Sequence, residues 1–172
     1  MEPSNMKLGG GLEDRTRWSA EDCSIDAAMK VVGTRSAMLL MREAHYGTTR
    51  FDDFVSRVGI SEAVASARLK ELVAAQLLRR EPYRQSGQRT RYEYVLTQAG
   101  VEFQPVLLAL MQWGDRHLPR EGAPPLLARH TECGSPLIVQ ACCEADHAVG
   151  VDEVTLLPRR NRRHASAHKD SS

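Results

Sequence analysis

Residues 61–96 read SEAVASARLKELVAAQLLRREPYRQSGQRTRYEYVL. The first part predicts a helix over residues 61–76, because the Ser61 hydroxyl can accept a hydrogen bond from an otherwise unpaired amide of the first turn. One side of this helix has four members at helical spacing: Ala65, Leu69, Leu72 and Gln76. The second part predicts a β-hairpin over residues 78–96, because Tyr92, Tyr94 and Leu96 occupy every second position, which is the spacing of one face of a strand. A helix followed directly by a hairpin decides the fold.

The preceding residues predict three short helices. Apolar residues recur at helical spacing on both sides of Gly33-Thr34, which indicates two helices joined by a short turn. A third helix is expected over residues 50–58, and Gly59 is a typical residue just past a helix end. Three helices and then a hairpin place a compact helix-turn-helix beside a projecting loop. We expect Ser86-Gly87-Gln88 to join the two strands of the hairpin.

The segment after the hairpin predicts one long helix over residues 98–118. Thr97 can cap its start, and Pro105 should kink it because proline removes one amide hydrogen bond. The helix carries more apolar surface than a small domain needs for itself, which implies a partner helix. The expected fold class is therefore α+β, mainly helical: a winged helix-turn-helix with a long C-terminal dimerisation helix.

Composition shifts divide the chain into four segments. We expect a flexible N-terminal arm at 1–22, a winged-helix domain at 23–118, and an extension of uncertain structure at 119–157. Residues 158–172 have four arginines and one lysine against one aspartate, which is typical of a basic disordered tail.

The order of elements points to double-stranded DNA as the partner. The second helix of such a pair lies in the major groove, where its N-terminal residues meet base edges. Ala63 and Ala67 allow a close approach, and the neighbouring polar residues can contact phosphates or bases. The predicted DNA-binding residues are Arg50, Ser61, Glu62, Ala63, Ser66, Ala67, Arg68, Lys70, Arg84, Arg89 and Arg91.

The hairpin concentrates positive charge in a chain whose net charge is only +1. Five arginines stand against Glu81 and Glu93 in this span: Arg79, Arg80, Arg84, Arg89 and Arg91. Guanidinium groups on a projecting loop can enter a narrow minor groove or bind phosphates with release of counterions. The alternative is an ordinary solvated face with surface ion pairs.

The sequence resembles the HxlR family of bacterial regulators over residues 23–118. The matching motifs are Cys23-Ser24-Ile25-Asp26, Arg50-Phe51-Asp52-Asp53-Phe54, Gly59-Ile60-Ser61-Glu62, Ala67-Arg68-Leu69-Lys70-Glu71-Leu72, Arg80-Glu81-Pro82-Tyr83, Tyr92-Glu93-Tyr94-Val95-Leu96-Thr97-Gln98-Ala99-Gly100 and Trp113-Gly114. The resemblance implies a winged helix, dimers built from the first and last helices, and regulation of nearby genes, often by repression. One departure is Gly33-Thr34-Arg35-Ser36, which stands where the family usually has Gly-Lys-Trp-Thr.

The resemblance and the apolar last helix together predict a homodimer. The residues expected at its interface are Ile25, Met29, Phe103, Leu107, Leu110 and Trp113. A dimer would hold two recognition helices against the two halves of a palindromic operator.

Cys23 is a candidate redox sensor, because many members of the family carry a cysteine at this position and some use it to sense oxidants or electrophiles. Arg15, Arg17 or the start of the first helix would favour its thiolate form. The alternative is a small apolar residue at a helix start.

The C-terminal extension contains possible metal ligands but no specific zinc pattern. Five His and Cys residues stand close in sequence: His130, Cys133, Cys142, Cys143 and His147. Zinc sites repeat paired ligands at defined spacing, and adjacent cysteines do not comfortably reach one tetrahedral ion. Some relatives carry a cysteine-rich tail of this kind, so a decayed zinc site is the alternative; we predict no metal and no cofactor.

Two other functional classes remain as alternatives. The chain has no phosphate-binding glycine loop, zinc-protease motif or nucleophile elbow, so we predict that it is not an enzyme. Among enzymes, the alternative is a cysteine-based hydrolase. A winged helix used only for protein contacts, or a non-specific architectural DNA-binding protein, is the alternative within binding proteins. Without a membrane span or signal peptide, we expect a cytoplasmic protein whose effector the sequence does not identify.

Overall fold

The chain forms two compact units, which we describe separately. This computed structural model describes residues 5–17, 23–83, 90–118 and 121–158. The larger unit covers residues 21–139, and the smaller one combines residues 1–20 with residues 140–172. In the described residues, no helix is both long enough and apolar enough to span a membrane.

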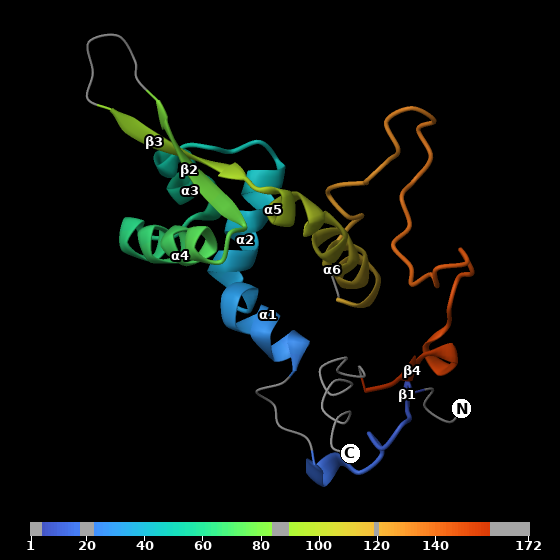
Figure 1. The fold of residues 1–172 in the computed structure, drawn as a ribbon. Helices are drawn as coiled ribbons and strands as arrows, with labels where there is room; N and C mark the ends of the chain where they lie inside the picture. The colour runs from blue at the N-terminus through green and yellow to red at the C-terminus, as the bar shows by residue number, and fades with distance from the viewer. Residues whose placement is uncertain (1–4, 18–22, 84–89, 119–120, 159–172) are drawn as a thin grey trace, which may run out of the picture. The chain divides into compact units, whose positions relative to one another are not determined.

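The larger unit is a winged helix (Figure 1). Four helices precede a two-stranded hairpin and two helices follow it: α1 (Ser24–Val32), α2 (Arg35–His45), α3 (Phe51–Val58), α4 (Glu62–Ala74), β2 (Leu78–Tyr83), β3 (Arg91–Leu96), α5 (Gln98–Glu102) and α6 (Gln104–His117). The predicted α+β, mainly helical class is confirmed.

The core lies where α2, α3 and α4 meet the base of the hairpin. Its largest fully buried side chains are Phe54, Leu40, Met41, Leu69, Leu72 and Leu78. The ring of Tyr94 on β3 meets the ring of Phe54 edge to face, with centroids 6.2 Å apart. Aromatic pairs favour this arrangement, and here it attaches the hairpin to α3.

The turn between α3 and α4 follows from two residues. Gly59 ends α3 with a φ of 69°, in the left-handed region that glycine enters without steric cost. The Ser61 hydroxyl then caps α4 by accepting a hydrogen bond from the Val64 amide at 3.4 Å. Both features confirm the sequence prediction.

The end of α4 differs from the prediction. Ala65, Leu69 and Leu72 share one side of α4, which is buried, but α4 ends at Ala74, so the prediction of a helix to residue 76 with Gln76 on that side was wrong. Gln76 has a φ of 59° and is exposed. Its carbonyl accepts a hydrogen bond from the Thr97 hydroxyl, so Gln76 turns the chain into β2.

The hairpin is antiparallel and begins directly after this turn. Its register pairs Leu78 with Leu96 at the base and Tyr83 with Arg91 at the far end. The predicted hairpin is confirmed, whereas the predicted turn residues Ser86-Gly87-Gln88 lie outside the described residues.

The single kinked helix that we expected after the hairpin is two helices. α5 ends at Glu102, Phe103 intervenes, and α6 begins at Gln104 with Pro105 in its first turn. Proline is favoured at this position because the amide that it lacks has no partner within the helix. Thr97 caps α5 as predicted, since its hydroxyl accepts from the Gly100 amide at 3.1 Å. Gly100 lies against the Leu77 carbonyl, where a Cβ atom would not fit.

The turn that departs from the family motif still forms a regular junction. The Thr34 hydroxyl caps α2 by accepting from the Ala37 amide at 3.1 Å, and Ala37 and Leu40 are fully buried. In α1, by contrast, only Val32 is buried. The first helix therefore contributes little to the core of this unit.

In the described residues of the smaller unit, the regular elements are short. β1 (Lys7–Leu8) pairs in parallel with β4 (Thr155–Leu156), accompanied by the single turns η1 (Arg15–Arg17) and η3 (Val151–Glu153). The boundaries that we predicted for the arm, the extension and the tail stay predictions, and residues 159–172 of the tail lie outside the described residues.

Candidate nucleic-acid interface

The outer face of α4 consists of small and polar side chains that the fold leaves free. Because Ala65, Leu69 and Leu72 anchor the helix in the core, the opposite side must face solvent. Six predicted residues are exposed there: Ser61, Glu62, Ala63, Ser66, Ala67 and Lys70. The start of this helix therefore presents a narrow surface that can approach another molecule closely.

The two basic residues of this face differ in their partners. Arg68 is half-buried and pairs with Glu71 through its Nη1 atom. Lys70 is exposed and has no ion-pair partner among the described residues. Lys70 is thus the cation on α4 that is available to an anionic ligand without first giving up a partner.

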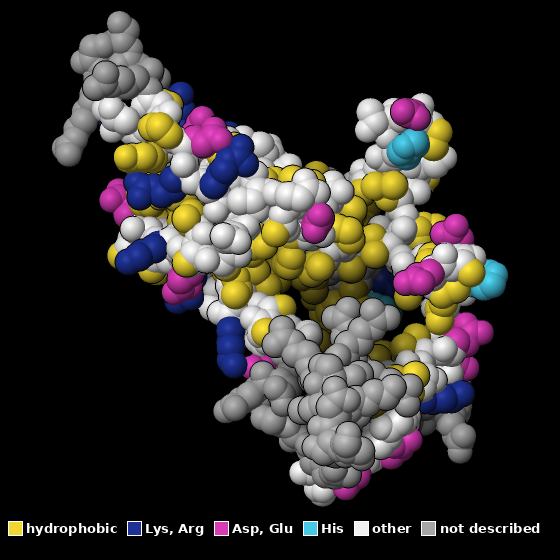
Figure 2. Space-filling model, in the orientation of Figure 1, with side chains coloured by type: hydrophobic (Ala, Val, Ile, Leu, Met, Phe, Trp, Pro, Cys, Tyr) yellow, Lys and Arg dark blue, Asp and Glu magenta, His cyan; other side chains and the backbone are white. Residues whose placement is uncertain are grey.

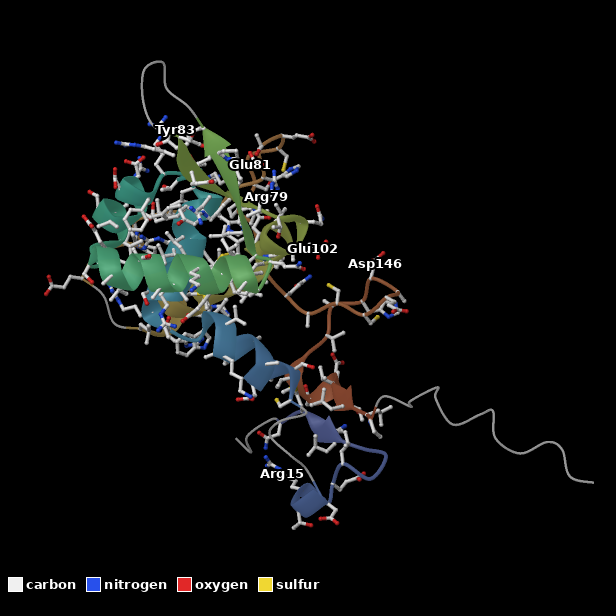
Figure 3. All side chains as sticks on the ribbon, turned by 60° about the vertical axis from the view of Figure 1, so that its left-hand side comes forward. Arg15, Arg79, Glu81, Tyr83, Glu102 and Asp146 are labelled. Carbon is white, nitrogen blue, oxygen red and sulfur yellow. The ribbon has the colours of Figure 1, made fainter. Side chains whose placement is uncertain are left out.

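The arginines of the hairpin also fall into two groups. Arg79 donates from Nε to Glu81 at 2.7 Å and from Nη1 to the Leu96 carbonyl at 3.0 Å, so it is held by its own hairpin (Figure 3). Arg80 instead lies over the Tyr92 ring, 4.1 Å from its centroid. Arg91 is exposed at the start of β3, without an ion-pair partner in the described parts of the chain. Arg84 and Arg89 lie outside the described residues.

Arg50 joins the hairpin to the helix pair. It precedes α3, and its backbone forms an isolated antiparallel β-bridge with Glu93 on β3. Its guanidinium lies 4.7 Å from the centroid of the Tyr83 ring. The Tyr94 amide donates to the Thr49 carbonyl at 2.8 Å beside it. These contacts fix the position of Arg50 relative to the hairpin.

Sequence reasoning missed the contacts of Arg50 with Tyr83 and of Arg80 with Tyr92. A cation over an aromatic ring is attracted to the ring face, so each contact favours one position of the guanidinium. The signal was present as arginines and tyrosines in both strands, but the partners depend on the register, which pairs Pro82 with Tyr92 and Tyr83 with Arg91. Figure 2 shows Lys and Arg side chains around the hairpin and the neighbouring helices.

The predicted dimerisation residues lie on α1 and α6, except for Phe103 between α5 and α6. Four of them are exposed apolar side chains: Ile25 (74%), Met29 (52%), Leu110 (47%) and Trp113 (55%). Leu107 is half-buried, and Phe103 packs against the core. Val106 on α6 is exposed as well, a residue that we had not included.

The four cysteines are free thiols in different surroundings. Cys23 is half-buried at the N-terminal cap of α1, without a side-chain capping hydrogen bond. Cys133 is exposed, and hydrogen bonds from Ser135, together with one from His130 at 3.2 Å, lower the pKa of its thiol to about 7. Backbone hydrogen bonds at Ala145 and His147 lower the pKa of Cys143. Stabilised thiolates in the extension were not predicted.

Among the described residues, no three His, Cys, Asp or Glu side chains come together in a way that could hold a metal ion. His130 and Cys133 occupy one turn of the larger unit, where the His130 amide donates to the Ser135 carbonyl at 2.9 Å. Cys143 and His147 occupy a second turn, in the smaller unit.

Comparison with known proteins agrees with this geometry. The sequence profile of the HxlR-like helix-turn-helix family matches residues 31–122, from the end of α1 to just beyond α6. The chain belongs to the HxlR-like helix-turn-helix family. An uncharacterized HTH-type transcriptional regulator of Mycobacterium tuberculosis (strain H37Rv) is 41% identical over 111 residues, which cover 64% of this chain and 69% of the relative. The uncharacterized regulator YdeP of Bacillus subtilis is 27% identical over 67% of this chain and 88% of its own length.

Solved structures share this fold. A proposed transcription factor from Pseudomonas aeruginosa is 32% identical, with a TM-score of 0.58 over 80% of this chain and 93% of its own. The redox regulator HypR in its oxidized form is 26% identical, with a TM-score of 0.51 over 57% of this chain and 100% of its own. This HxlR-like protein is therefore a DNA-binding helix-turn-helix transcriptional regulator.

Proposed function

We propose that this HxlR-like regulator binds a specific operator as a homodimer, with α4 in the major groove and the hairpin along the adjacent backbone or minor groove. One observation carries the proposal. The exposed face of α4, made of small residues, lies in the same unit as three arginine side chains that form no ion pair with an acidic side chain among the described residues. These are Arg50, Arg80 and Arg91. An α-helix fits the major groove, and basic groups beside it bind phosphates.

The homodimer is supported by the exposed apolar residues of α1 and α6. Large apolar side chains gathered on one surface are typical of protein interfaces rather than of solvated faces. Two copies would present two α4 helices to half-sites about 34 Å apart, which predicts a palindromic operator. We propose repression as the outcome and the cytoplasm as the location.

The first experiment is a selection of bound duplexes from a random-sequence pool, with an excess of unrelated DNA as competitor. We expect an enriched sequence with two-fold symmetry, and fluorescence anisotropy should show at least about a thousandfold preference for it over a scrambled duplex, at the low end for specific binding. Equal affinity for both duplexes would favour the architectural alternative. No affinity at low salt would favour the protein-contact alternative.

Repression is tested separately. A reporter gene downstream of the selected operator should be expressed less when the regulator is present and more when Lys70→Ala replaces it. Increased expression in the presence of the wild-type regulator would identify an activator instead, with no change to the assignment of α4 and the hairpin.

Redox control through Cys23 is the second part of the proposal. It is supported by the position of Cys23 at the start of α1, on which we place part of the dimer interface, and by the likeness to the redox regulator HypR. An oxidised or alkylated thiol there would change the packing between two copies.

The competing thiol is Cys133, which is exposed and has a lowered pKa. The matched variants are Cys23→Ser and Cys133→Ser, each treated with iodoacetamide before the anisotropy measurement. We expect alkylation to reduce operator affinity in Cys133→Ser and to have no effect in Cys23→Ser. The reverse pattern would move the sensor to Cys133, whose alkylation rate should be half-maximal near pH 7 because only the thiolate reacts.

A further inference from the structure

An apolar cavity of about 440 Å³ lies between α2 and α6. Its walls include Met38 and Leu39 from α2, and Leu107, Leu108 and Met111 from α6. Pro125 and Leu126, from the segment that follows α6, complete it. Sites for small molecules have volumes of roughly 300–1,000 Å³ and are lined mainly by apolar side chains. The cavity thus has the size and lining of a small-molecule site.

Beyond Leu126, the segment that follows α6 is hydrogen-bonded back to α6. The Gln112 side chain donates from Nε2 to the Leu137 carbonyl at 2.9 Å and accepts from the Val139 amide at 3.0 Å. Leu137 in turn donates to the Ala128 carbonyl at 2.9 Å. These bonds hold Leu137 and Val139 to α6, and through Leu137 they also hold Ala128, two residues after Leu126. The chain itself therefore supplies the third wall of the cavity.

One polar group of a cavity-lining residue lacks a partner. The Nδ1 atom of His45 lies 2.9 Å from the Met41 carbonyl, which can only accept, so Nδ1 carries the proton. In the neutral ring Nε2 is then an acceptor. It is buried, and no described residue donates to it. An unsatisfied buried acceptor is unfavourable, and a bound hydroxyl or N–H would satisfy it once a neighbouring side chain moves aside, while the bond from Nδ1 to Met41 keeps the ring in place.

The charges around the cavity disfavour an anionic occupant. Arg42 is already paired with Glu43, with Nη2 and Oε1 2.7 Å apart, and its guanidinium lies 5.8 Å from the centroid of the Tyr46 ring. Asp115 adds a carboxylate to the lining. A ligand carboxylate would therefore meet one acid and a cation that already has a partner.

We propose that this cavity binds a neutral, mainly apolar molecule with one hydroxyl or N–H donor, of which a phenol is the simplest example. The apolar body fills the space between α2 and α6, and the donor binds Nε2 of His45. This assignment rests on the cavity and on the unpartnered nitrogen, and it is independent of the operator.

Occupancy of the cavity also regulates DNA binding, a step that rests on the proposed function. His45 is the last residue of α2 and Tyr46 follows it, so both lie a few residues before Arg50. The intervening chain is held at the buried Thr48, which donates to Glu43 at 3.3 Å, and at Thr49, which bonds to β3. A displacement of the end of α2 is thereby transmitted to Arg50 and the hairpin.

The binding test uses three probes of one shape in isothermal calorimetry: 1-naphthol, 1-methoxynaphthalene and 1-naphthoate. We expect 1-naphthol to bind one molecule per chain. The methyl ether should bind about 2- to 10-fold more weakly, the effect of one lost hydrogen bond. The carboxylate should bind more weakly still, because burial of a charge is costly. Equal affinities for naphthol and ether overturn the role of His45, and no saturable binding of any probe overturns the site.

Two variants locate the probe. In Gly114→Leu the new side chain grows beside Leu118, another lining residue, and an added Cβ meets nothing closer than 3.9 Å. This variant should fold and lose binding of all three probes. His45→Phe should remove the preference for naphthol over the ether while both still bind. Naphthol binding that survives in Gly114→Leu overturns the location.

The regulatory step has separate readouts. Naphthol should change the operator affinity of the wild-type protein and leave that of Gly114→Leu unchanged. If the wild-type protein binds naphthol but no operator, the proposed function fails and the site stands. If Gly114→Leu instead converts a dimer into a monomer, the cavity is a contact between copies and the ligand assignment is overturned.

Discussion

Helices α4 and α6 are both rich in apolar residues, but the chain buries them very differently. Ala65, Leu69 and Leu72 of α4 have no exposed surface, whereas α6 has no fully buried residue at all. The exposed side of α4 is small and polar, and the exposed side of α6 includes Leu110 and Trp113. A helix whose apolar side is buried within its own unit can offer its free face to DNA, while the exposed apolar side chains of α6 form the surface on which we propose that a second copy packs.

The largest effect expected from this contrast is on stability. Leu69→Ala should lower the free energy of unfolding by about 2–5 kcal/mol, because it removes a fully buried side chain and leaves a cavity in the core. Leu110→Ala removes the same atoms from a half-exposed position and should cost less than about 1 kcal/mol in the monomer. Urea denaturation at a low protein concentration measures both. Similar losses would mean that α6 belongs to the core after all.

The next effect concerns association. Leu110→Glu places a charge on the exposed apolar face of α6, and we expect the dimer to weaken by at least about tenfold, since one apolar contact in an interface can be worth more than about 1 kcal/mol. Sedimentation equilibrium gives the dissociation constant. Asp52→Ala on α3 is the control, because this exposed residue lies on neither α1 nor α6. A variant that dimerises as tightly as the wild type would remove α6 from the interface.

A smaller effect is expected on the DNA side of the comparison. Lys70→Ala should weaken operator binding roughly three- to tenfold, because a charge-assisted contact of about 1 kcal/mol is lost while the fold is untouched. Lys30→Ala is the matched control, since Lys30 is an exposed lysine on α1 that pairs with Asp26 at 2.7 Å. Anisotropy with the selected operator measures both variants. Equal losses would indicate a general charge effect instead of a contact from α4.

The parts of the fold that sequence predicted well are those that local chemistry determines. Ser61, Gly59 and Thr97 end or begin helices through bonds to residues at most four positions away, and the structure has all three. The break at Phe103 was missed because Pro105 is compatible with either a kink or a new helix start, and a local pattern does not choose between them. The choice is made where Phe103 packs against the core.

The candidate site divides in the same way. The exposed residues of α4 follow from the positions of its buried ones, so their exposure could be predicted. The state of each arginine could not, because it depends on which side chain lies across the hairpin: Glu81 and the Leu96 carbonyl for Arg79, and Tyr92 for Arg80. The cavity was also invisible in the sequence, since its walls come from segments far apart along the chain.

The smallest effect tests that division among the arginines. Arg91→Ala should reduce the slope of log affinity against log salt by about one unit, because one phosphate contact and its released counterion are lost. Arg79→Ala should leave the slope unchanged, since Arg79 already binds Glu81 and the Leu96 carbonyl. Both variants remove one positive charge from the same hairpin, so long-range attraction falls equally and only a direct contact separates them. If Arg79→Ala changes the slope as much as Arg91→Ala does, the hairpin acts as a diffuse positive charge, and the bonds of its arginines do not determine which of them reaches the DNA.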